Sequence, residues 1–211
     1  MEKRINNFID NLSRVSSTDL YFNPYSLDLS INAIRRNNLN LYFQEVARLK
    51  SKTLLLGESP GYQGCRQTGV PFTGEAILLS GIPELGLFGA TKGYVKTNEF
   101  TKVLKEPTST IMWSTLAKYN FVPLLWSAFP FHSFRPGNHQ SNRTPNKQEL
   151  DEGQKFYQNL IDIFDIKKVV AVGNVAKDSL DLAGVNSDKI RHPSHGGKSD
   201  FVKGIIELLK I

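Results

Sequence analysis

The sequence predicts an α/β fold, a three-layer α/β/α sandwich in which helices cover both faces of a parallel sheet. Short apolar strands alternate with amphipathic helices along the chain, which is the pattern of such sheets. Polar loops follow three of the predicted strands at their carboxyl ends, where open α/β sheets bind ligands. With 211 residues and 40% hydrophobic content, the chain is long enough to bury one full core. We therefore expect a single domain spanning residues 1–211.

The first part of the chain predicts two helices and then the first strand. Apolar residues recur at helical spacing in residues 1–15 and again in residues 39–49. Residues 16–30 lie between these helices and are predicted to form a loop. The first strand is predicted at residues 53–56, a short apolar run that ends at a glycine and is followed at once by the carboxylate of Glu58.

A glycine-rich loop follows this strand and contains Gly57-Glu58-Ser59-Pro60-Gly61 and then Gly69-Val70-Pro71-Phe72. A P-loop would end in Lys-Ser or Lys-Thr, where this chain has Gln67-Thr68. The glycine spacing also differs from the dinucleotide fingerprint, so neither mode of nucleotide binding is expected. Because Glu58 comes directly after a buried strand, we expect it at the mouth of a site rather than as a solvated loop acid.

The remaining elements continue the alternation of strands and helices. Three further strands are predicted at residues 121–129, 167–173 and 188–191. The predicted helices cover residues 73–79, 108–119, 144–164 (starting at Thr144-Pro145), 174–184 (capped by Asn174) and 201–209. Residues 80–105, with their scattered glycines and prolines, are predicted to form an irregular excursion.

Composition restricts the class of protein and its partners. The net charge of +6 and the pI near 9.3 favour anionic partners, nucleic acid first. The chain has no run of eighteen apolar residues and no apolar signal core near its start, so we expect no membrane association and a cytoplasmic location. Cys65 is the single cysteine, which excludes a disulfide or an all-cysteine metal site within one chain. No helical His-x-x-x-His pair is present, so we expect no bound metal. We also expect no cofactor, and we expect the protein to be a monomer.

Parallel strands would bring three polar loops to one edge of the sheet. These are the loop that begins with Glu58, the loop of residues 127–138 and the loop that begins with His192. Glu58 and His192 could act there as an acid/base or water-positioning pair, although His192 could also be an ordinary loop histidine. Tyr62 and Phe72 could stack on a nucleic-acid base, whereas Phe72 could equally pack in the core. His132, His139 and His195 give weaker signals. Basic residues near this edge could contact phosphates or form an ordinary charged rim; they are Arg135, Arg143, Lys147, Arg191 and Lys198.

Taken in order, these motifs resemble those of the uracil-DNA glycosylase superfamily. The glycine-rich loop resembles the first motif of its iron–sulfur branch, and His192-Pro193-Ser194 resembles the second motif of the superfamily. Residues 135–145 resemble the segment that follows the second strand in the same branch. The resemblance covers residues 53–197. It implies a four-stranded parallel sheet of order 2-1-3-4 and a hydrolase that excises uracil or another deaminated base from DNA.

The resemblance also implies roles for individual residues. Glu58 would position the hydrolytic water, since Ser59 stands where other branches have Asp or Asn. His192 would face the carbonyl oxygen of the base, and Phe72 would stack on the flipped base, with Tyr62 and Ser127 as further base-binding residues. Pro60, Gly61 and Ser194 would hold phosphates around the lesion. Together with them, the residues predicted to bind DNA are Ser59, Arg143 and Lys198.

Two departures from the family pattern affect these expectations. The cysteines that hold the iron–sulfur cluster are missing, so no cluster is expected. Trp126-Ser127 stands where the family usually has an asparagine that reads the edge of uracil, and a hydroxyl has less hydrogen-bonding capacity than an amide. The base excised is therefore open. A non-catalytic nucleic-acid-binding relative is the next alternative, and a small-molecule enzyme on an α/β sheet is the third.

Overall fold

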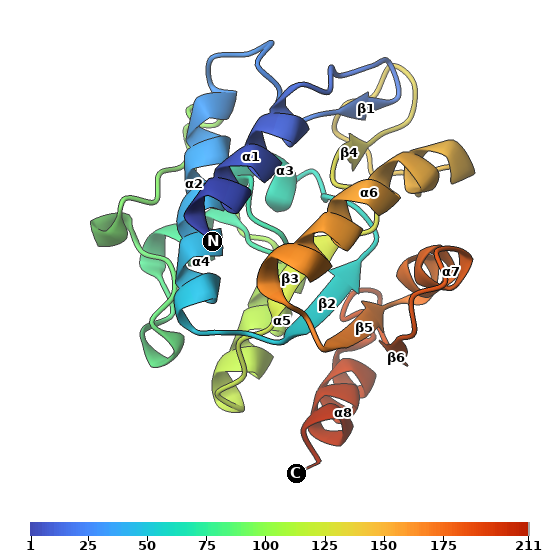
Figure 1. Ribbon diagram of the computed structural model, residues 1–211. Helices are drawn as coiled ribbons and strands as arrows, with labels where there is room; N and C mark the ends of the chain where they lie inside the picture. The colour runs from blue at the N-terminus through green and yellow to red at the C-terminus, as the bar shows by residue number, and fades with distance from the viewer. Residues whose placement is uncertain (211) are drawn as a thin grey trace.

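The computed structural model describes residues 1–210 and contains the predicted parallel sheet between layers of helices (Figure 1). The sheet consists of β2 (Thr53–Gly57), β3 (Leu124–Ser127), β5 (Lys168–Val172) and β6 (Asp188–Ile190). These strands are all parallel and lie in the order β3-β2-β5-β6. Counted along the chain, this order is 2-1-3-4, which confirms the predicted topology.

The central strands are apolar because helices cover both of their faces. In β2 and β5 only the first residue is partly exposed, and the four residues that follow it are buried. Such continuous apolar runs are typical of strands in the interior of a parallel sheet. The edge strand β6 differs, since Asp188 and Lys189 are exposed and only Ile190 is buried.

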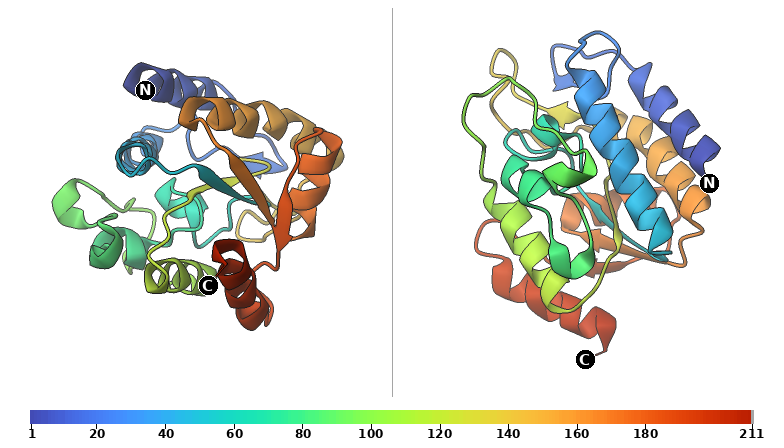
Figure 2. Two further views of the ribbon diagram at one scale, coloured as in Figure 1. Left: turned by 60° about the horizontal axis from the view of Figure 1, so that its bottom comes forward. Right: turned by 90° about the vertical axis from the view of Figure 1, so that its left-hand side faces the viewer.

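The helices form the two outer layers. They are α1 (Glu2–Ser13), α2 (Asn32–Arg48), α3 (Cys65–Thr68), α4 (Glu75–Ser80), α5 (Pro107–Lys118), α6 (Lys147–Phe164), α7 (Asn174–Leu182) and α8 (Lys198–Leu209), with 3-10 helices η1 (Pro83–Leu85) and η2 (Ala90–Lys92). Helices α1, α2 and α6 pack together on one side of the sheet, and α5 and α8 lie side by side on the other (Figure 2). Within residues 1–210 we find no helix long and apolar enough to cross a membrane.

Aromatic side chains join the first helical layer to the sheet. The ring of Phe8 on α1 lies 5.4 Å from that of Trp126 on β3, and the ring of Phe43 on α2 lies 5.7 Å from the same indole. All three side chains are buried. Burying such large apolar surfaces is a major stabilising contribution, and here it fixes the position of β3.

Helix α2 begins at Asn32, seven residues before the predicted start at residue 39. The extra turns escaped the prediction because polar residues face the interior there, with Asn32, Arg35 and Asn38 all buried. Their side chains are hydrogen-bonded to other parts of the chain, which removes the usual cost of burying them. An apolar period cannot reveal a helix face of this kind.

A second, two-stranded sheet lies in segments that were predicted to be loops. β1 (Tyr21–Phe22) pairs antiparallel with β4 (His132–Ser133), in the register Tyr21 opposite Ser133. Strands of two residues are too short to produce a detectable alternation. This sheet ties residues 16–30 to the loop that follows β3 (Figure 1).

Other helices and strands begin or end a few residues from their predicted positions. The predicted strand at 121–129 is regular only over Leu124–Ser127, and the predicted loop after β2 contains the short helix α3. Helix α6 starts at Lys147 instead of Thr144, because Asn146 and Glu149 form a capping box. Asn174 is the first residue of α7 and not its cap, which is Gly173 with a positive φ of 98°.

Candidate active site

The sheet brings the end of β2 and the end of β3 together at one edge. Gly57 pairs with Ser127 in the last register position of the two strands. Beyond it, the Ala128 N–H donates to the Gly57 carbonyl oxygen at 2.8 Å, and the Phe129 N–H donates to the Glu58 carbonyl oxygen at 3.0 Å. The backbone of Glu58 is therefore fixed by the strand beside it. Its side chain is partly exposed, and its carboxylate has no hydrogen-bond partner among residues 1–210.

The ring of Phe72 connects this strand end to the loop after β6. A Cβ atom on Gly57 would lie 2.3 Å from Cζ of Phe72, so only glycine allows the ring to pack against the strand at this point. The ring centroid of Phe72 lies 5.9 Å from that of His192, with the planes inclined by 37°. Phe72 remains partly exposed. Glu58 and Phe72 from the glycine-rich loop and His192 from the second motif thus belong to one part of the sheet edge.

The hydrogen bonds of His192 define its tautomer. The backbone N–H of Ser194 donates to Nδ1 of His192 at 3.2 Å. Because an amide can only donate, Nδ1 carries no hydrogen, and the neutral ring carries its hydrogen on Nε2. Burial, aided by the positive charges of Arg191 and His195, lowers the pKa of His192 to about 4. At neutral pH, His192 is therefore an uncharged hydrogen-bond donor through Nε2.

The loop of Ser59, Pro60 and Gly61 is anchored by a buried histidine. Nδ1 of His132 lies 2.8 Å from the Pro60 carbonyl oxygen, and its Nε2 lies 3.2 Å from the carbonyl oxygen of His139. Burial lowers the pKa of His132, although both carbonyl oxygens favour its protonated form. A Cβ atom on Gly61 would meet nothing within 4 Å, so the backbone of the loop borders open space there.

Arg143, a predicted phosphate contact, is bound within the protein. Its guanidinium makes five hydrogen bonds, two of them to the carboxylate of Glu149 and the others to the carbonyl oxygens of Leu20, Phe134 and Thr144. A guanidinium has five N–H groups, so none remains for a phosphate. The structure instead gives Arg143 the role of holding the start of α6 to the segment around β1 and β4.

We expect Arg143→Lys to lower the free energy of unfolding by about 1–3 kcal/mol, because a lysine keeps the charge but leaves buried acceptors unpaired. Denaturant unfolding measures this change. Lys198→Met serves as the comparison, since Lys198 is exposed at the start of α8 and should affect DNA binding without affecting stability. A loss of DNA affinity in Arg143→Lys at unchanged stability would contradict this structural role and support a phosphate contact by Arg143.

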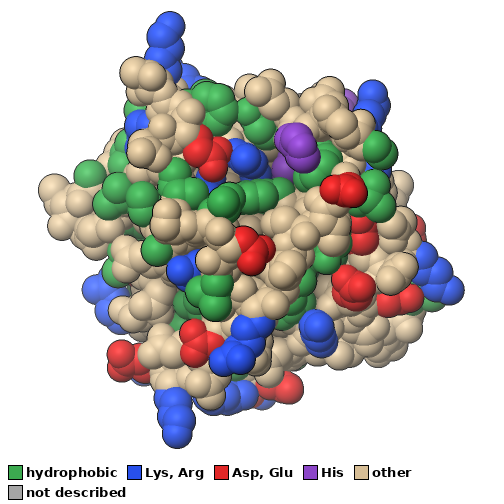
Figure 3. Space-filling view, turned by 90° about the horizontal axis from the view of Figure 1, so that it is seen from above, with side chains coloured by type: hydrophobic (Ala, Val, Ile, Leu, Met, Phe, Trp, Pro, Cys, Tyr) green, Lys and Arg blue, Asp and Glu red, His purple; other side chains and the backbone are tan. Residues whose placement is uncertain are grey.

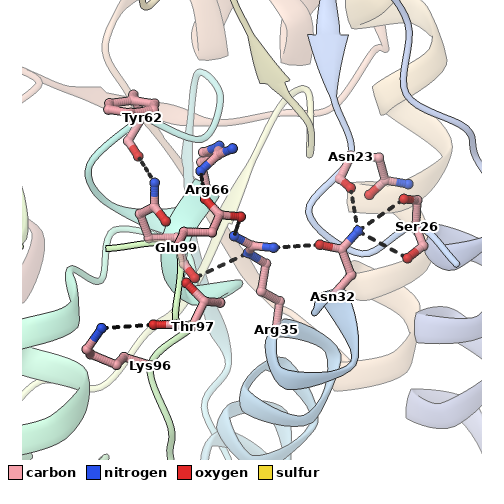
Figure 4. Close-up of polar contacts among 10 residues, drawn as sticks. Asn23, Ser26, Asn32, Arg35, Tyr62, Arg66, Lys96, Thr97 and Glu99 are labelled. Carbon is pink, nitrogen blue, oxygen red and sulfur yellow. Dashed lines mark hydrogen bonds and ion pairs between the residues drawn. The ribbon is translucent and has the colours of Figure 1, made fainter. Parts of the chain in front are cut away.

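A buried polar cluster that the sequence did not reveal supports the glycine-rich loop (Figure 4). The fully buried Arg35 on α2 donates to Glu99 Oε1 at 2.5 Å, and Arg66 on α3 pairs with the other oxygen of Glu99. Arg35 also donates to the carbonyl oxygen of Gln67 at 3.2 Å. The side-chain amide of Gln67 in turn donates to the carbonyl oxygen of Tyr62 at 3.2 Å. The cluster therefore fixes α3 and the residues just before it.

The carboxylate of Glu99 offsets part of the positive charge of the two guanidinium groups beside it. Burial acts to raise the pKa of Glu99, but hydrogen bonds from Arg35 and Arg66 and their positive charges outweigh it, so the pKa is lowered. Glu99 belongs to the irregular excursion at residues 80–105, which thereby gains a function in supporting the loop.

The ring of Tyr62 lies beside this polar cluster, among aromatic rings and the guanidinium of Arg66. Its ring centroid is 6.2 Å from that of Phe100 and 6.0 Å from that of His132, and the guanidinium of Arg66 lies 5.4 Å above the ring. Figure 3 shows the end of the molecule that carries β1 and β4, where histidine, basic and acidic side chains lie among hydrophobic groups. Stacking of Tyr62 on a nucleic-acid base remains a prediction.

Two surface hollows lie away from these residues. One, of about 500 Å³, borders α2 and Lys92, and one of about 230 Å³ lies between α1 and α2. Neither is lined by a predicted site residue, so the candidate site is defined by its chemistry and not by the size of a hollow. Within residues 1–210, no group of three or more His, Cys, Asp or Glu side chains is placed to hold a metal ion.

Comparisons with known proteins agree with this geometry. The structure of SMUG2 from Pedobacter heparinus shares the fold, with a TM-score of 0.66 and 17% sequence identity over 99% of this chain and 96% of that chain. A search of curated proteins gives no match. The model of the Uracil DNA glycosylase superfamily matches residues 43–207, a range that includes Glu58, Phe72, Ser127 and His192. The chain therefore belongs to the uracil-DNA glycosylase superfamily.

Proposed function

We propose that this protein is a DNA glycosylase that hydrolyses the N-glycosidic bond of uracil or another deaminated base in DNA. Members of its superfamily are DNA glycosylases. The observation that carries the proposal is that the ring of Phe72 packs against Gly57, the residue before the unengaged carboxylate of Glu58, and also lies beside the neutral imidazole of His192. A carboxylate and a neutral donor are the two groups that this reaction requires.

In the proposed mechanism, the glycosidic bond breaks while positive charge develops on the sugar and negative charge on the departing base. The carboxylate of Glu58 stabilises the oxocarbenium-like sugar and orients the attacking water. The Nε2–H of His192 donates to a carbonyl oxygen of the base as negative charge grows there. Because His192 is neutral before the reaction, the site binds an uncharged base without a resident cation.

Phe72 and Ser127 would contact the flipped base. The ring of Phe72 is held on one side by Gly57 and stays partly exposed, so it offers a surface for stacking. Ser127 is 6% exposed and lies opposite Gly57 at the end of β3. The loop of Ser59, Pro60 and Gly61, together with Ser194 and Lys198, would hold the phosphates around the flipped nucleotide.

Labelled oligonucleotides that carry uracil, hypoxanthine or xanthine test this proposal. Excision leaves an abasic site, and alkali then cleaves the strand to a shorter fragment. We expect cleavage with at least one of these bases and none with an undamaged oligonucleotide. Binding to DNA without excision of any base would instead support the alternative, a non-catalytic relative that binds nucleic acid.

We expect DNA binding to weaken steeply between low and moderate salt concentration. The net charge of +6 implies that lysine and arginine side chains neutralise phosphates and release counterions. Fluorescence anisotropy with a labelled oligonucleotide measures the slope. Single strands and mismatched sites should bind at least as well as matched duplex, since unstacking a paired base costs a few kcal/mol. An affinity independent of salt would contradict a DNA partner.

Ser127→Asn should raise the excision of uracil relative to the other bases. An asparagine amide offers both a donor and an acceptor to the edge of uracil, and a buried polar pair of this kind is worth about 1–3 kcal/mol when lost. Ratios of single-turnover rates on the three bases measure the preference, and Ser127→Ala is the control that only removes the hydroxyl. An unchanged preference in Ser127→Asn would exclude Ser127 from the recognition pocket.

A further inference from the structure

We propose that His132 takes up a proton from solvent when a DNA phosphate binds at Gly61, and that the charged imidazole then holds the peptide between Pro60 and Gly61 in place. The inference rests on the proposed function and deepens it, because it makes His132 a positioning residue for the loop that would hold phosphates. His132 lies on β4 and is fully buried, so its side chain contacts no ligand directly. It acts through the backbone of the glycine-rich loop.

The surroundings of His132 offer two hydrogen-bond acceptors, whereas a neutral imidazole has one N–H group to donate. Nδ1 lies 2.8 Å from the carbonyl oxygen of Pro60, and Nε2 lies 3.2 Å from that of His139. Because a carbonyl oxygen only accepts, either neutral tautomer turns a lone pair toward one of the two oxygens. The imidazolium carries an N–H group on both nitrogens and satisfies both oxygens. The geometry therefore fits the charged ring better than the neutral one.

Burial and two positive neighbours oppose this protonation in the protein without DNA. Burial is the largest effect that lowers the pKa of His132, and the charges of Arg66 on α3 and of His139 lower it further. The hydrogen bonds to the carbonyl oxygens of Pro60 and His139 raise the pKa, but the net result lies below the usual value of a histidine. Protonation therefore needs a negative charge that offsets these effects.

The other side chains packed around His132 do not supply that charge. Tyr62 of the glycine-rich loop and Phe134 place aromatic rings 6.0 Å and 5.9 Å from the imidazole. Phe22 of β1 is the partner of His132 in the register of the small sheet. Within residues 1–210, no ion pair joins His132 to a carboxylate. A bound phosphate would be the missing negative charge.

The peptide between Pro60 and Gly61 connects His132 to the predicted phosphate position. All peptide bonds of the described chain are trans, so the N–H of Gly61 points away from the Pro60 carbonyl oxygen and hence away from His132. No group within residues 1–210 accepts a hydrogen bond from this N–H, and the space beside Gly61 is open. The N–H is therefore available to an anion, and backbone N–H groups commonly bind DNA phosphates.

Through this peptide, protonation and phosphate binding assist each other. A charged donor on the carbonyl oxygen of Pro60 polarises the peptide, which makes the Gly61 N–H a stronger donor. A phosphate on that N–H makes the carbonyl oxygen a stronger acceptor, and its negative charge also favours the charged form of His132 directly. Linked equilibria are reciprocal, so if DNA favours the proton on His132, a lower pH favours the binding of DNA.

NMR titration of the histidine rings tests the inference on the wild-type protein. The chain has four histidines, and variants of the other three (His139→Gln, His192→Gln and His195→Gly) assign the resonances of His132 by elimination. The ligand is an oligonucleotide with a tetrahydrofuran abasic-site analogue, which cannot be excised. We expect the pKa of His132 to rise when this oligonucleotide binds. Binding with an unchanged pKa would overturn the inference and leave the proposed function intact, whereas a protein that binds no DNA would overturn both.

A variant that cannot titrate gives the second test. His132→Asn places an amide N–H near the position of Nδ1, which keeps the bond to the Pro60 carbonyl oxygen but removes the protonation. Between about pH 7.5 and about pH 5.5, we expect the affinity for the oligonucleotide to rise about 5- to 10-fold more in the wild type than in His132→Asn, at the low end of typical couplings. His192, with a pKa of about 4, stays neutral over this range. Equal rises in both proteins would overturn the inference.

His139→Gln is the matched control, because it removes an exposed imidazole and keeps the backbone oxygen that faces His132. Its affinity should rise with falling pH as in the wild type. If His139→Gln loses the rise and His132→Asn keeps it, His139 is the group that titrates, and the inference is overturned. Thermal unfolding shows whether each variant folds, and the NMR titration of the wild type decides the question if His132→Asn does not.

Discussion

Replacing Glu58 by glutamine is expected to slow base excision by about 10²–10⁴ while leaving DNA affinity nearly unchanged. Glutamine keeps the size of the side chain and the backbone hydrogen bond from Phe129 to residue 58. It removes the negative charge that stabilises the cationic sugar and orients water. Because the carboxylate makes no hydrogen bond to another described residue, its loss should also leave the stability unchanged. Single-turnover excision and anisotropy measure the two effects separately.

Glu84→Gln is the matched control for this prediction. Glu84 is exposed on η1, and its replacement changes the net charge by the same amount without touching the sheet edge. Its excision rate should equal that of the wild type. If wild-type protein excises a base and Glu58→Gln excises it equally fast, Glu58 does not act in the chemical step. A loss of affinity as large as the loss in rate would assign Glu58 to binding.

The strand ends of the site could be predicted from the sequence because they depend on short-range patterns. An apolar run followed by a carboxylate indicates β2 and Glu58, and the short strand predicted at residues 188–191, followed by His-Pro-Ser, indicates β6 and His192. Parallel strands align their carboxyl ends, so two local patterns imply a shared edge. The sheet order, by contrast, came from the resemblance to the superfamily, and the structure confirms it.

The support of the site could not be predicted, because its partners lie far apart in the chain. Arg35 and Glu99 are 64 residues apart, and neither belongs to a periodic pattern that announces a buried ion pair. The one available signal was Arg66, a basic residue within a glycine-rich stretch. Burial of Arg35 also hid the start of α2, since a charged residue on the inner face breaks the apolar period.

Arg143 shows the opposite case. Its place in the sequence suggested a phosphate contact, whereas the structure shows its guanidinium fully hydrogen-bonded within the protein. Its position after the loop of residues 130–138 suggested a phosphate contact near the site. The structure places Glu149 on the first turn of α6, where it accepts two hydrogen bonds from Arg143 and one from the backbone N–H of Asn146. A basic residue close to a site in sequence need not be available to a ligand.

The protonation state of His192 has a measurable consequence for stability. Its pKa in the folded protein is about 4, against 6.5 for an unperturbed histidine. Between these values the unfolded chain binds a proton that the folded protein does not. This residue therefore lowers the free energy of unfolding progressively as the pH falls from about 6.5 to 4, and contributes nothing above this window. Above pH 5 the folded protein keeps the neutral Nε2–H donor.

Replacing His192 by alanine should slow excision by about 10²–10³, the usual cost of losing one donor to a developing oxyanion. DNA affinity should change little, since the donor acts mainly in the transition state. His192→Gln is the matched variant, because its amide can place an N–H group near Nε2 and should recover part of the rate. It should also remove the fall in stability between pH 6.5 and 4, which denaturant unfolding measures. Equal rates for His192→Ala and wild type would exclude this donor, whereas equal losses in His192→Ala and His192→Gln would assign the effect to the shape of the imidazole and not to its N–H group.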